Sequence, residues 1–233
     1  MKETVVDNSI KQHPLLIELV GPAGAGKTTL SRALSQQSEK IEVGAEIELR
    51  KIRQIPVFVR NALFLLPFIL WRSPYSRGFT WEEIKALVYL KGWTRVLKAQ
   101  AKQNGKAILL DHGPVFKLAT LHEFGPEILK SERFDLWWNQ MFGQWASTVD
   151  IVIWLDAPDR ILEERINSRN QRHAVKGKSE SHISLFLARY RLSYEEILTK
   201  LKTYGKPILF RFDTSQTPIE KIVDDLLIIC KSC

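Results

Sequence analysis

The stretch Gly21-Pro22-Ala23-Gly24-Ala25-Gly26-Lys27-Thr28 decides the fold of this chain. It has the form Gly, any four residues, Gly, Lys and then Ser or Thr, which is the form of the phosphate-binding P-loop. The largely apolar run of residues 15–20 before it is typical of a buried strand, and residues 28–37 after it are typical of a helix. Because the motif stands between a strand and a helix, we predict a true P-loop rather than a glycine-rich turn without a ligand.

The same loop predicts how a nucleoside triphosphate would bind. Its glycines let consecutive backbone N–H groups point into one hollow, and the N-terminus of the following helix adds partial positive charge. We expect Lys27 to reach the β- and γ-phosphates and the Thr28 hydroxyl to contact Mg²⁺. The predicted cofactors are therefore ATP and Mg²⁺, and the phosphate-binding residues are Gly21, Ala23, Gly24, Ala25, Gly26, Lys27, Thr28 and Thr29.

Length and composition indicate a single α/β domain over residues 1–233. The chain is 45% hydrophobic and 26% charged, which is ordinary for a globular protein. Its net charge of +8 suits polyphosphate substrates as well as nucleic acid or an anionic membrane, so charge alone does not choose among them. Two cysteines, Cys230 and Cys233, are too few for a disulfide framework or a zinc site.

No stretch of the sequence predicts secretion or a membrane span. Residues 1–13 are polar and lack the apolar centre of a secretion signal. Residues 55–71 are apolar but contain Pro56, Arg60, Asn61 and Pro67, and they fall short of the ~20 apolar residues of a span. We interpret them as a helical segment broken near Pro67. We therefore expect a cytoplasmic protein, and we do not expect nucleic acid or a membrane as its partner.

Apolar runs alternate with helical patterns along the chain. The predicted strands are residues 15–20, 40–43, 107–110, 151–155 and 207–212, and the predicted helices are 28–37, 80–103, 115–148 with a break at Gly125-Pro126, a helix after Pro158, 185–204 and a last one after Thr217. Such crossovers make a parallel sheet. Ligands of parallel sheets bind at the carboxyl ends of the strands, where the sequence places Gly21, Asp111, Asp156 and Asp213.

Two further features of the sequence suit phosphoryl transfer. Asp111, after a buried strand, could hold Mg²⁺ through water or accept the proton of a substrate hydroxyl, although it could also be a helix N-cap. Arg165, Arg169 and Arg172 follow at spacings of four and three, which predicts one stripe on a helix that could close over the phosphates or simply face solvent. His112 could contact the substrate or only pack.

From residue 15 to about residue 229 the chain resembles the nucleoside and nucleoside-monophosphate kinases, the thymidylate kinases in particular. The resemblance implies a three-layer P-loop NTPase fold with a five-stranded parallel sheet in the order 2-3-1-4-5 and helices on both faces. It also implies a substrate-covering helical region at 44–105 and an arginine-bearing lid at 165–184. In the lid Arg165 and Arg169 would act in catalysis and Arg172 would bind the nucleotide, whose adenine would lie on Asp213-Thr214-Ser215.

One position departs from the family pattern. His112 stands where these kinases often have an arginine that grips the acceptor. Glu46 lies where nucleoside kinases place a catalytic carboxylate, so it competes with Asp111 for the role of base. Arg53 and His112 are the candidates for acceptor binding, and a homodimer is left open as the assembly.

The sequence thus favours an ATP-dependent kinase that phosphorylates a small acceptor, a nucleoside or nucleotide first. A kinase for a non-nucleotide metabolite, such as a sugar or hydroxy acid, is the second hypothesis. A non-catalytic nucleotide-binding module that contacts nucleic acid or membrane is the third. The Asn-Lys-x-Asp motif of GTPases and the Leu-Ser-Gly-Gly-Gln signature of transporter ATPases do not occur in the sequence.

Overall fold

A five-stranded parallel sheet forms the centre of the protein. The computed structural model describes residues 14–44, 55–70, 77–170, 173–205 and 207–231. The strand order is β2-β3-β1-β4-β5, from β1 (Leu16–Val20), β2 (Ile41–Val43), β3 (Ala107–Leu110), β4 (Ile151–Asp156) and β5 (Ile208–Asp213). The predicted fold class and the order 2-3-1-4-5 are therefore confirmed, and each strand lies within one residue of its predicted ends.

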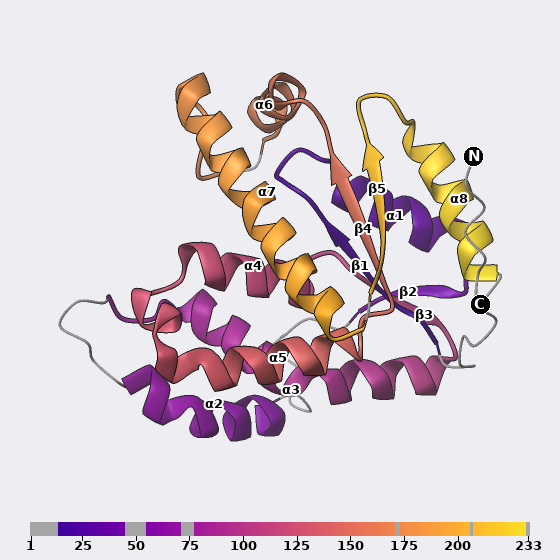
Figure 1. Ribbon diagram of the computed structural model, residues 1–233. Coiled ribbons are helices and arrows are strands. Elements are labelled where there is room, and N and C mark those ends of the chain that lie inside the picture. The colour runs from indigo at the N-terminus through magenta and orange to yellow at the C-terminus, as the bar shows by residue number, and fades with distance from the viewer. Residues whose placement is uncertain (1–13, 45–54, 71–76, 171–172, 206, 232–233) are drawn as a thin grey trace.

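Helices cover both faces of the sheet (Figure 1). One face carries α1 (Lys27–Gln37) and α8 (Ile219–Lys231), which contact each other. The other carries α3 (Trp81–Asn104), α4 (Pro114–Phe124), α5 (Asp135–Ala146) and α7 (Glu180–Thr203), with α2 (Ile55–Leu70) outside α3. The short helices η2 (Glu127–Lys130) and η3 (Glu132–Phe134) link α4 to α5, and α6 (Asp159–Ser168) follows β4.

Alternation along β1 explains why the core has two halves. Leu16 and Val20 belong to the apolar cluster under α3, α4, α5 and α7, whereas Ile17 and Leu19 belong to the cluster under α1 and α8. Successive side chains of a strand point to opposite faces, so a strand covered on both sides is apolar at nearly every position. The exception is Glu18, which is fully buried in the middle of β1.

The boundaries of α3 follow from the sequence signals. The Thr80 hydroxyl accepts from the Glu83 N–H at 3.3 Å, and the Thr80 N–H donates to Glu83 Oε2 at 2.8 Å, which completes a capping box. Gly105, with φ of 61°, ends the helix in the left-handed region. Both ends of this helix were therefore predictable from the local sequence alone.

The predicted break near Pro67 is wrong, because α2 runs as one helix to Leu70. Packing of α2 along α3 offsets the hydrogen bond that a proline removes. The contact is close, since a Cβ at Gly92 of α3 would come within 1.8 Å of Asn61 Nδ2. On its outer side α2 exposes Ile55, Val59, Leu63 and Leu66.

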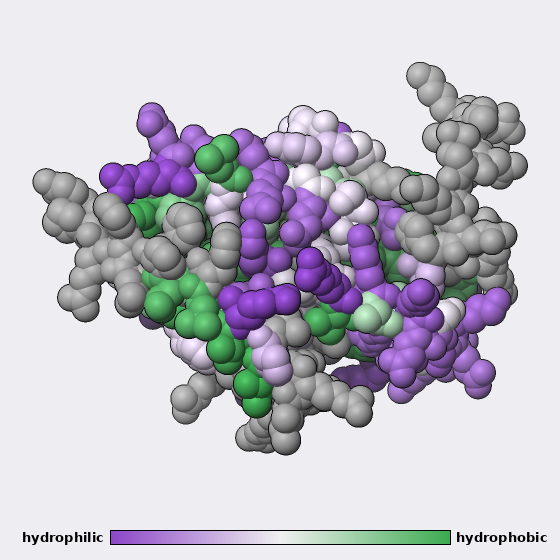
Figure 2. Space-filling model, turned by 90° about the horizontal axis from the view of Figure 1, so that it is seen from below, coloured by the Kyte–Doolittle hydropathy of each residue, from purple (hydrophilic) through white to green (hydrophobic). Residues whose placement is uncertain are grey.

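The outer side of α2 contributes to an apolar area on the surface. Figure 2, which views the molecule from below, shows green side chains gathered at the lower left, on the same left-hand side where α2 lies in Figure 1. Among the helices that the structure describes, none is long and apolar enough to cross a membrane.

Candidate functional site

The loop between β1 and α1 has the backbone that a P-loop needs. Gly21 has φ of 138°, and a Cβ there would lie 1.9 Å from the Leu155 carbonyl oxygen of β4. Gly24 (φ 86°) and Gly26 (φ 92°), the N-cap of α1, also adopt left-handed conformations that favour glycine. Of the remaining predicted loop residues, Ala25 packs into the core and Thr29 is exposed on α1, so neither side chain lines the cavity at this loop.

Lys27 folds back over the loop. Its Nζ donates to the carbonyl oxygens of Gly21 at 2.7 Å and Pro22 at 2.9 Å. Burial lowers the pKa of Lys27 to about 8, although the nearby Asp111 carboxylate opposes this shift. A partly buried ammonium that contacts carbonyl oxygens can exchange them for an anion, and phosphate oxygens are suitable partners.

Thr28 and Asp111 meet at the carboxyl end of the sheet. The Thr28 hydroxyl donates to Asp111 Oδ2 at 2.9 Å, while Asp111 Oδ1 is buried without a hydrogen-bond partner. A hydroxyl and a carboxylate in contact fit Mg²⁺, which takes oxygen ligands, keeps several waters and binds through one or two carboxylates and substrate phosphates. No cluster of three or more His, Cys, Asp or Glu residues occurs in the described part of the chain, so a metal here would depend on the phosphates as well.

The three predicted arginines do not form one helical stripe. α6 ends at Ser168, and Arg169 has extended backbone angles, so the predicted helix through Arg172 is wrong. The carbonyl oxygen of Arg169, left free by the helix end, accepts instead from the Lys176 ammonium. The described part of the segment predicted as a lid thus comprises the end of α6, a turn region and the first residues of α7. Arg172, like Glu46 and Arg53, lies outside the described residues.

Arg165 and Arg169 have different surroundings. Arg165 donates to the Gly24 carbonyl at 3.3 Å, to the Thr214 hydroxyl at 2.8 Å and to the Thr214 carbonyl at 3.0 Å. It therefore ties the P-loop to the β5–α8 loop. Arg169 instead lines the cavity at the P-loop together with Lys27, so it is the arginine placed to meet a phosphate.

The loop predicted to hold adenine satisfies many of its own polar groups. Asp213 Oδ1 accepts from the Ser215 N–H at 2.8 Å and from the Ser215 hydroxyl at 2.6 Å. The Thr214 N–H donates to the Asp156 carbonyl at 2.8 Å. These contacts and Arg165 fix the loop beside the P-loop, at the same edge of the sheet.

Two cavities meet at His112 and Phe116. One, of about 260 Å³, is lined by the P-loop, Arg169, His173 and three aromatic side chains of α7, Phe186, Tyr190 and Tyr194. The other, of about 440 Å³, lies between α3 and α4 and is lined by Glu82, Glu83, Lys85, Ala86, Tyr89, Lys117, Thr120 and Leu121. His112 and Phe116 line both, and their rings pack edge to face with centroids 4.5 Å apart. The two roles considered for His112, packing and ligand contact, are thus compatible.

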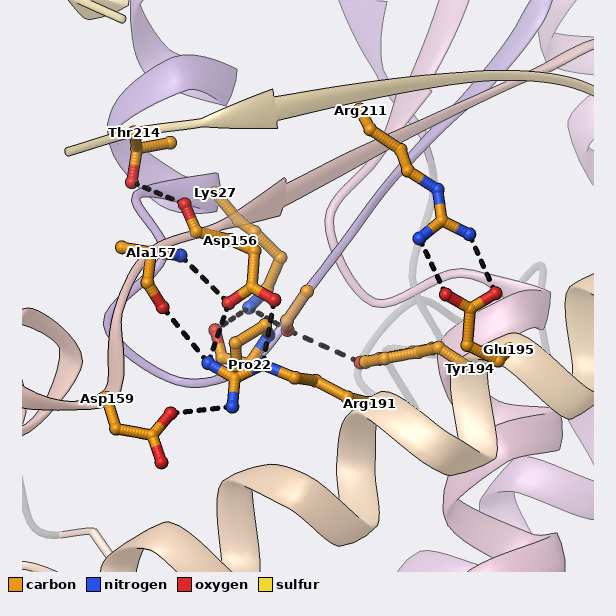
Figure 3. A network of polar contacts seen from close by, with 11 residues as sticks. Pro22, Lys27, Asp156, Ala157, Asp159, Arg191, Tyr194, Glu195, Arg211 and Thr214 are labelled. Carbon is orange, nitrogen blue, oxygen red and sulfur yellow. Dashed lines mark hydrogen bonds and ion pairs between the residues drawn. The ribbon is translucent and has the colours of Figure 1, made fainter. Parts of the chain in front are cut away.

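Sequence reasoning missed an ionic cluster that joins α7 to β4. Arg191 donates to both carboxylate oxygens of Asp156, at 2.7 and 3.0 Å, to Asp159 at 2.6 Å and to the Ala157 carbonyl at 3.0 Å (Figure 3). One turn further along α7, the Tyr194 hydroxyl reaches the Gly21 carbonyl at 3.5 Å. Of these residues, only Asp156 could be noticed in the sequence, because it ends a predicted strand. Its contacts with Arg191 could not be predicted, because the two residues are far apart along the chain.

Glu18 is the second residue that sequence reasoning missed. Its signal was a single charge inside an apolar strand. Burial raises the pKa of its carboxyl to about 7, while hydrogen bonds from the Phe116 and Val115 N–H groups act in the opposite direction.

Comparisons with known proteins agree with this geometry. The AAA domain family matches residues 16–193. No curated protein matches the chain. Among solved structures, deoxyadenosine kinase from M. mycoides, with dCMP and dCDP bound, is 16% identical with a TM-score of 0.53, covering 94% of this chain and 100% of its own. The YorR protein of Bacillus subtilis, in complex with phosphorylated GDP, is 16% identical with a TM-score of 0.51, covering 93% and 95%.

A second structure of the M. mycoides kinase, with dATP bound, is 20% identical with a TM-score of 0.51 and covers 91% of this chain and 100% of its own. At these identities the likeness concerns the fold. The predicted resemblance to P-loop nucleoside kinases is confirmed at that level, while the narrower likeness to thymidylate kinases stays a prediction. The chain therefore belongs to the AAA domain family and has the fold of the P-loop nucleoside kinases.

Proposed function

We propose that the protein is an ATP-dependent kinase that transfers the γ-phosphate to a hydroxyl of a small acceptor, most favourably a nucleoside or nucleotide. The observation that carries this proposal is the contact between Thr28 and Asp111 beside the P-loop. It joins a phosphate-binding loop to a carboxylate with one unpartnered oxygen. Phosphoryl transfer needs this combination of phosphate binding, metal ligands and a group for the acceptor proton.

The two adjoining cavities divide the substrates. The triphosphate would lie in the cavity at the P-loop, where Lys27 exchanges its carbonyl partners for phosphate oxygens and Arg169 faces the developing charge. The acceptor would lie between α3 and α4, where Tyr89 and Phe116 offer aromatic surface and Lys117 and Glu83 line the polar part. The acceptor hydroxyl would then approach past His112, which both cavities share.

The chain's own groups account for the transfer. When bound, Mg²⁺ would be held by Thr28 and Asp111 and would neutralise charge on the phosphates. Asp111 Oδ1 can accept the proton of the acceptor hydroxyl, directly or through water. Glu46, outside the described residues, remains the alternative base. A nucleoside or nucleotide is favoured as the acceptor because the structural neighbours named above were solved with nucleotides bound.

The test is acceptor-dependent release of ADP by the purified protein. Nucleosides, nucleoside monophosphates, sugars and hydroxy acids are offered in turn, so the panel also decides between a nucleotide and a non-nucleotide acceptor. Lys27→Ala is expected to abolish release and Asp111→Asn to lower it by about 100-fold or more. Lys98→Ala, which removes an exposed charge of α3, is the matched control and should behave as wild type. Equal rates in all four proteins would end the proposal.

A further inference from the structure

Glu18 links β1 to the start of α4. Its side chain is fully buried, and its two carboxylate oxygens accept from the N–H groups of Val115 and Phe116, each at 2.9 Å. Val115 and Phe116 are the second and third residues of α4. A strand residue 97 positions upstream therefore caps this helix.

α4 has no N-cap side chain of its own. Its N-cap residue is Gly113 and its first residue is Pro114, which has no N–H. The next N–H groups need an acceptor, which a Ser, Thr, Asp or Asn at the N-cap usually supplies. Here a Cβ at Gly113 would come within 2.7 Å of Glu18 Cδ. The Glu18 carboxyl thus occupies the space that a local cap would take.

The capped end of α4 carries the centre of the candidate site. Asp111 and His112 immediately precede it, and Phe116 lies in its first turn. Asp111 contacts Thr28, and His112 and Phe116 line both cavities. Fixing the N–H groups of residues 115 and 116 to β1 therefore fixes this turn against the strand that leads into the P-loop.

A cap with only a structural role would require less free energy if the N-cap residue of α4 supplied it. Burying a carboxylate costs free energy that a serine at the N-cap would not require. Glu18 faces Lys117 from α4, Asp111 from the β3–α4 turn and Tyr194 from α7, so its charge also lies among groups of the site. The cap therefore sits where it can influence the reacting groups as well as the helix.

We propose that Glu18 is a positioning residue for phosphoryl transfer, because its carboxylate holds the start of α4 and thereby sets Asp111, His112 and Phe116 against the P-loop. This inference rests on the proposed kinase function. Glu18 itself does not line either cavity, so it acts through the residues that do.

A cap exchange tests the inference. Glu18→Ala removes the distant cap, and misplacement of the site should lower kcat roughly 10- to 100-fold while KM for ATP stays unchanged. Gly113→Ser alone forces a side chain against the Glu18 carboxyl and should lower kcat as well. In the double variant, which carries both Glu18→Ala and Gly113→Ser, the Glu18 carboxyl no longer blocks the serine side chain. The flexible end of Leu110 remains 2.9 Å from the position of the serine Cβ and can shift, so the serine can cap α4 locally. Its kcat should return most of the way to the wild-type value.

Asp150→Ala is the matched control. Asp150 is also a buried carboxylate, and it accepts from the Leu16 N–H at 2.9 Å, but at the opposite end of the sheet. The Asp150→Ala variant should have a lower Tm than wild type but the same kcat. Two results would overturn this inference and leave the kinase proposal intact. The first is a Glu18→Ala variant that is as active as an active wild type. The second is a folded double variant that is as slow as Glu18→Ala. If Glu18→Ala does not fold, the double variant still decides. A wild type that phosphorylates no acceptor overturns the kinase proposal and the inference together.

Discussion

Lys27 is the residue whose charge state depends most directly on a ligand. Its side chain is partly buried, its ammonium contacts two carbonyl oxygens, and desolvation lowers its pKa to about 8. Phosphate oxygens close to it would favour the charged form and raise this pKa. Binding of a triphosphate and protonation of Lys27 are therefore coupled.

Proton uptake on ATP binding follows from this coupling. At a pH of about 8.5 a large share of Lys27 is neutral in the free protein, so ATP binding should take up a fraction of a proton. Calorimetric titration in buffers of different ionisation heat measures that fraction. The uptake should vanish in Lys27→Ala and persist in Lys98→Ala. The same uptake in Lys27→Ala would contradict the coupling.

Glu18 should make stability depend on pH in an unusual direction. Its folded pKa of about 7 exceeds the model-peptide value of 4.5, so the folded state binds the extra proton between these values. The contribution of Glu18 to the free energy of unfolding is thus fully present below the pKa of the unfolded state and is lost as pH rises through the pKa of the folded state. The loss amounts to about 3 kcal/mol. Urea unfolding across this range measures it. The stability of Glu18→Gln should increase relative to that of wild type as pH rises. A difference in unfolding free energy that does not change with pH would contradict a raised pKa for Glu18.

Two ion pairs join α7 to neighbouring strands and differ in burial. Arg191 contacts Asp156, Asp159 and the Ala157 carbonyl, and Arg211 pairs with Glu195 (Figure 3). Arg191 is about a quarter exposed, whereas Arg211 and Glu195 are both about half exposed. Exposed pairs contribute little because water screens them, whereas removing Arg191 from a partly buried cluster leaves two carboxylates that water reaches less well.

Arg191→Ala should therefore destabilise the protein more than Arg211→Ala does. We expect about 2 kcal/mol or more for Arg191→Ala and at most about 1 kcal/mol for Arg211→Ala. For a chain of this size each kcal/mol corresponds to roughly 2–4 °C in Tm, so thermal unfolding resolves the difference. An equal or larger loss in Arg211→Ala would show that this cluster does not fasten α7.

Local signals predicted most elements, and the failures have physical causes. The capping box at Thr80 and Glu83 and the glycine loop depend on neighbours in sequence, so they could be predicted. The end of α6 could not, because the spacing of three arginines does not reveal where a helix stops. The caps and clusters of Glu18 and Arg191 join residues far apart in sequence, and no local pattern indicates them.

The sheet is what brings the candidate site together. Parallel order 2-3-1-4-5 places the carboxyl ends of β1, β3, β4 and β5 at one edge (Figure 1). The P-loop and Asp111 directly follow β1 and β3, and Asp156 and Asp213 end β4 and β5. That much followed from alternating strands and helices and from the family resemblance. The sequence could not predict that two cavities meet at His112 and Phe116, because their walls come from α3, α4 and α7 together.

The most direct test follows the phosphate itself. The protein is incubated with Mg²⁺, ATP labelled with ¹⁸O in the γ-phosphate, and the acceptor that supports ADP release. Mass spectrometry then reports whether the labelled phosphoryl group is on the acceptor. We predict a labelled phosphorylated acceptor with wild type and Lys98→Ala, none with Lys27→Ala, and about 100-fold less or lower still with Asp111→Asn. Labelled inorganic phosphate alone, with no phosphorylated acceptor from wild type, would contradict transfer at this site.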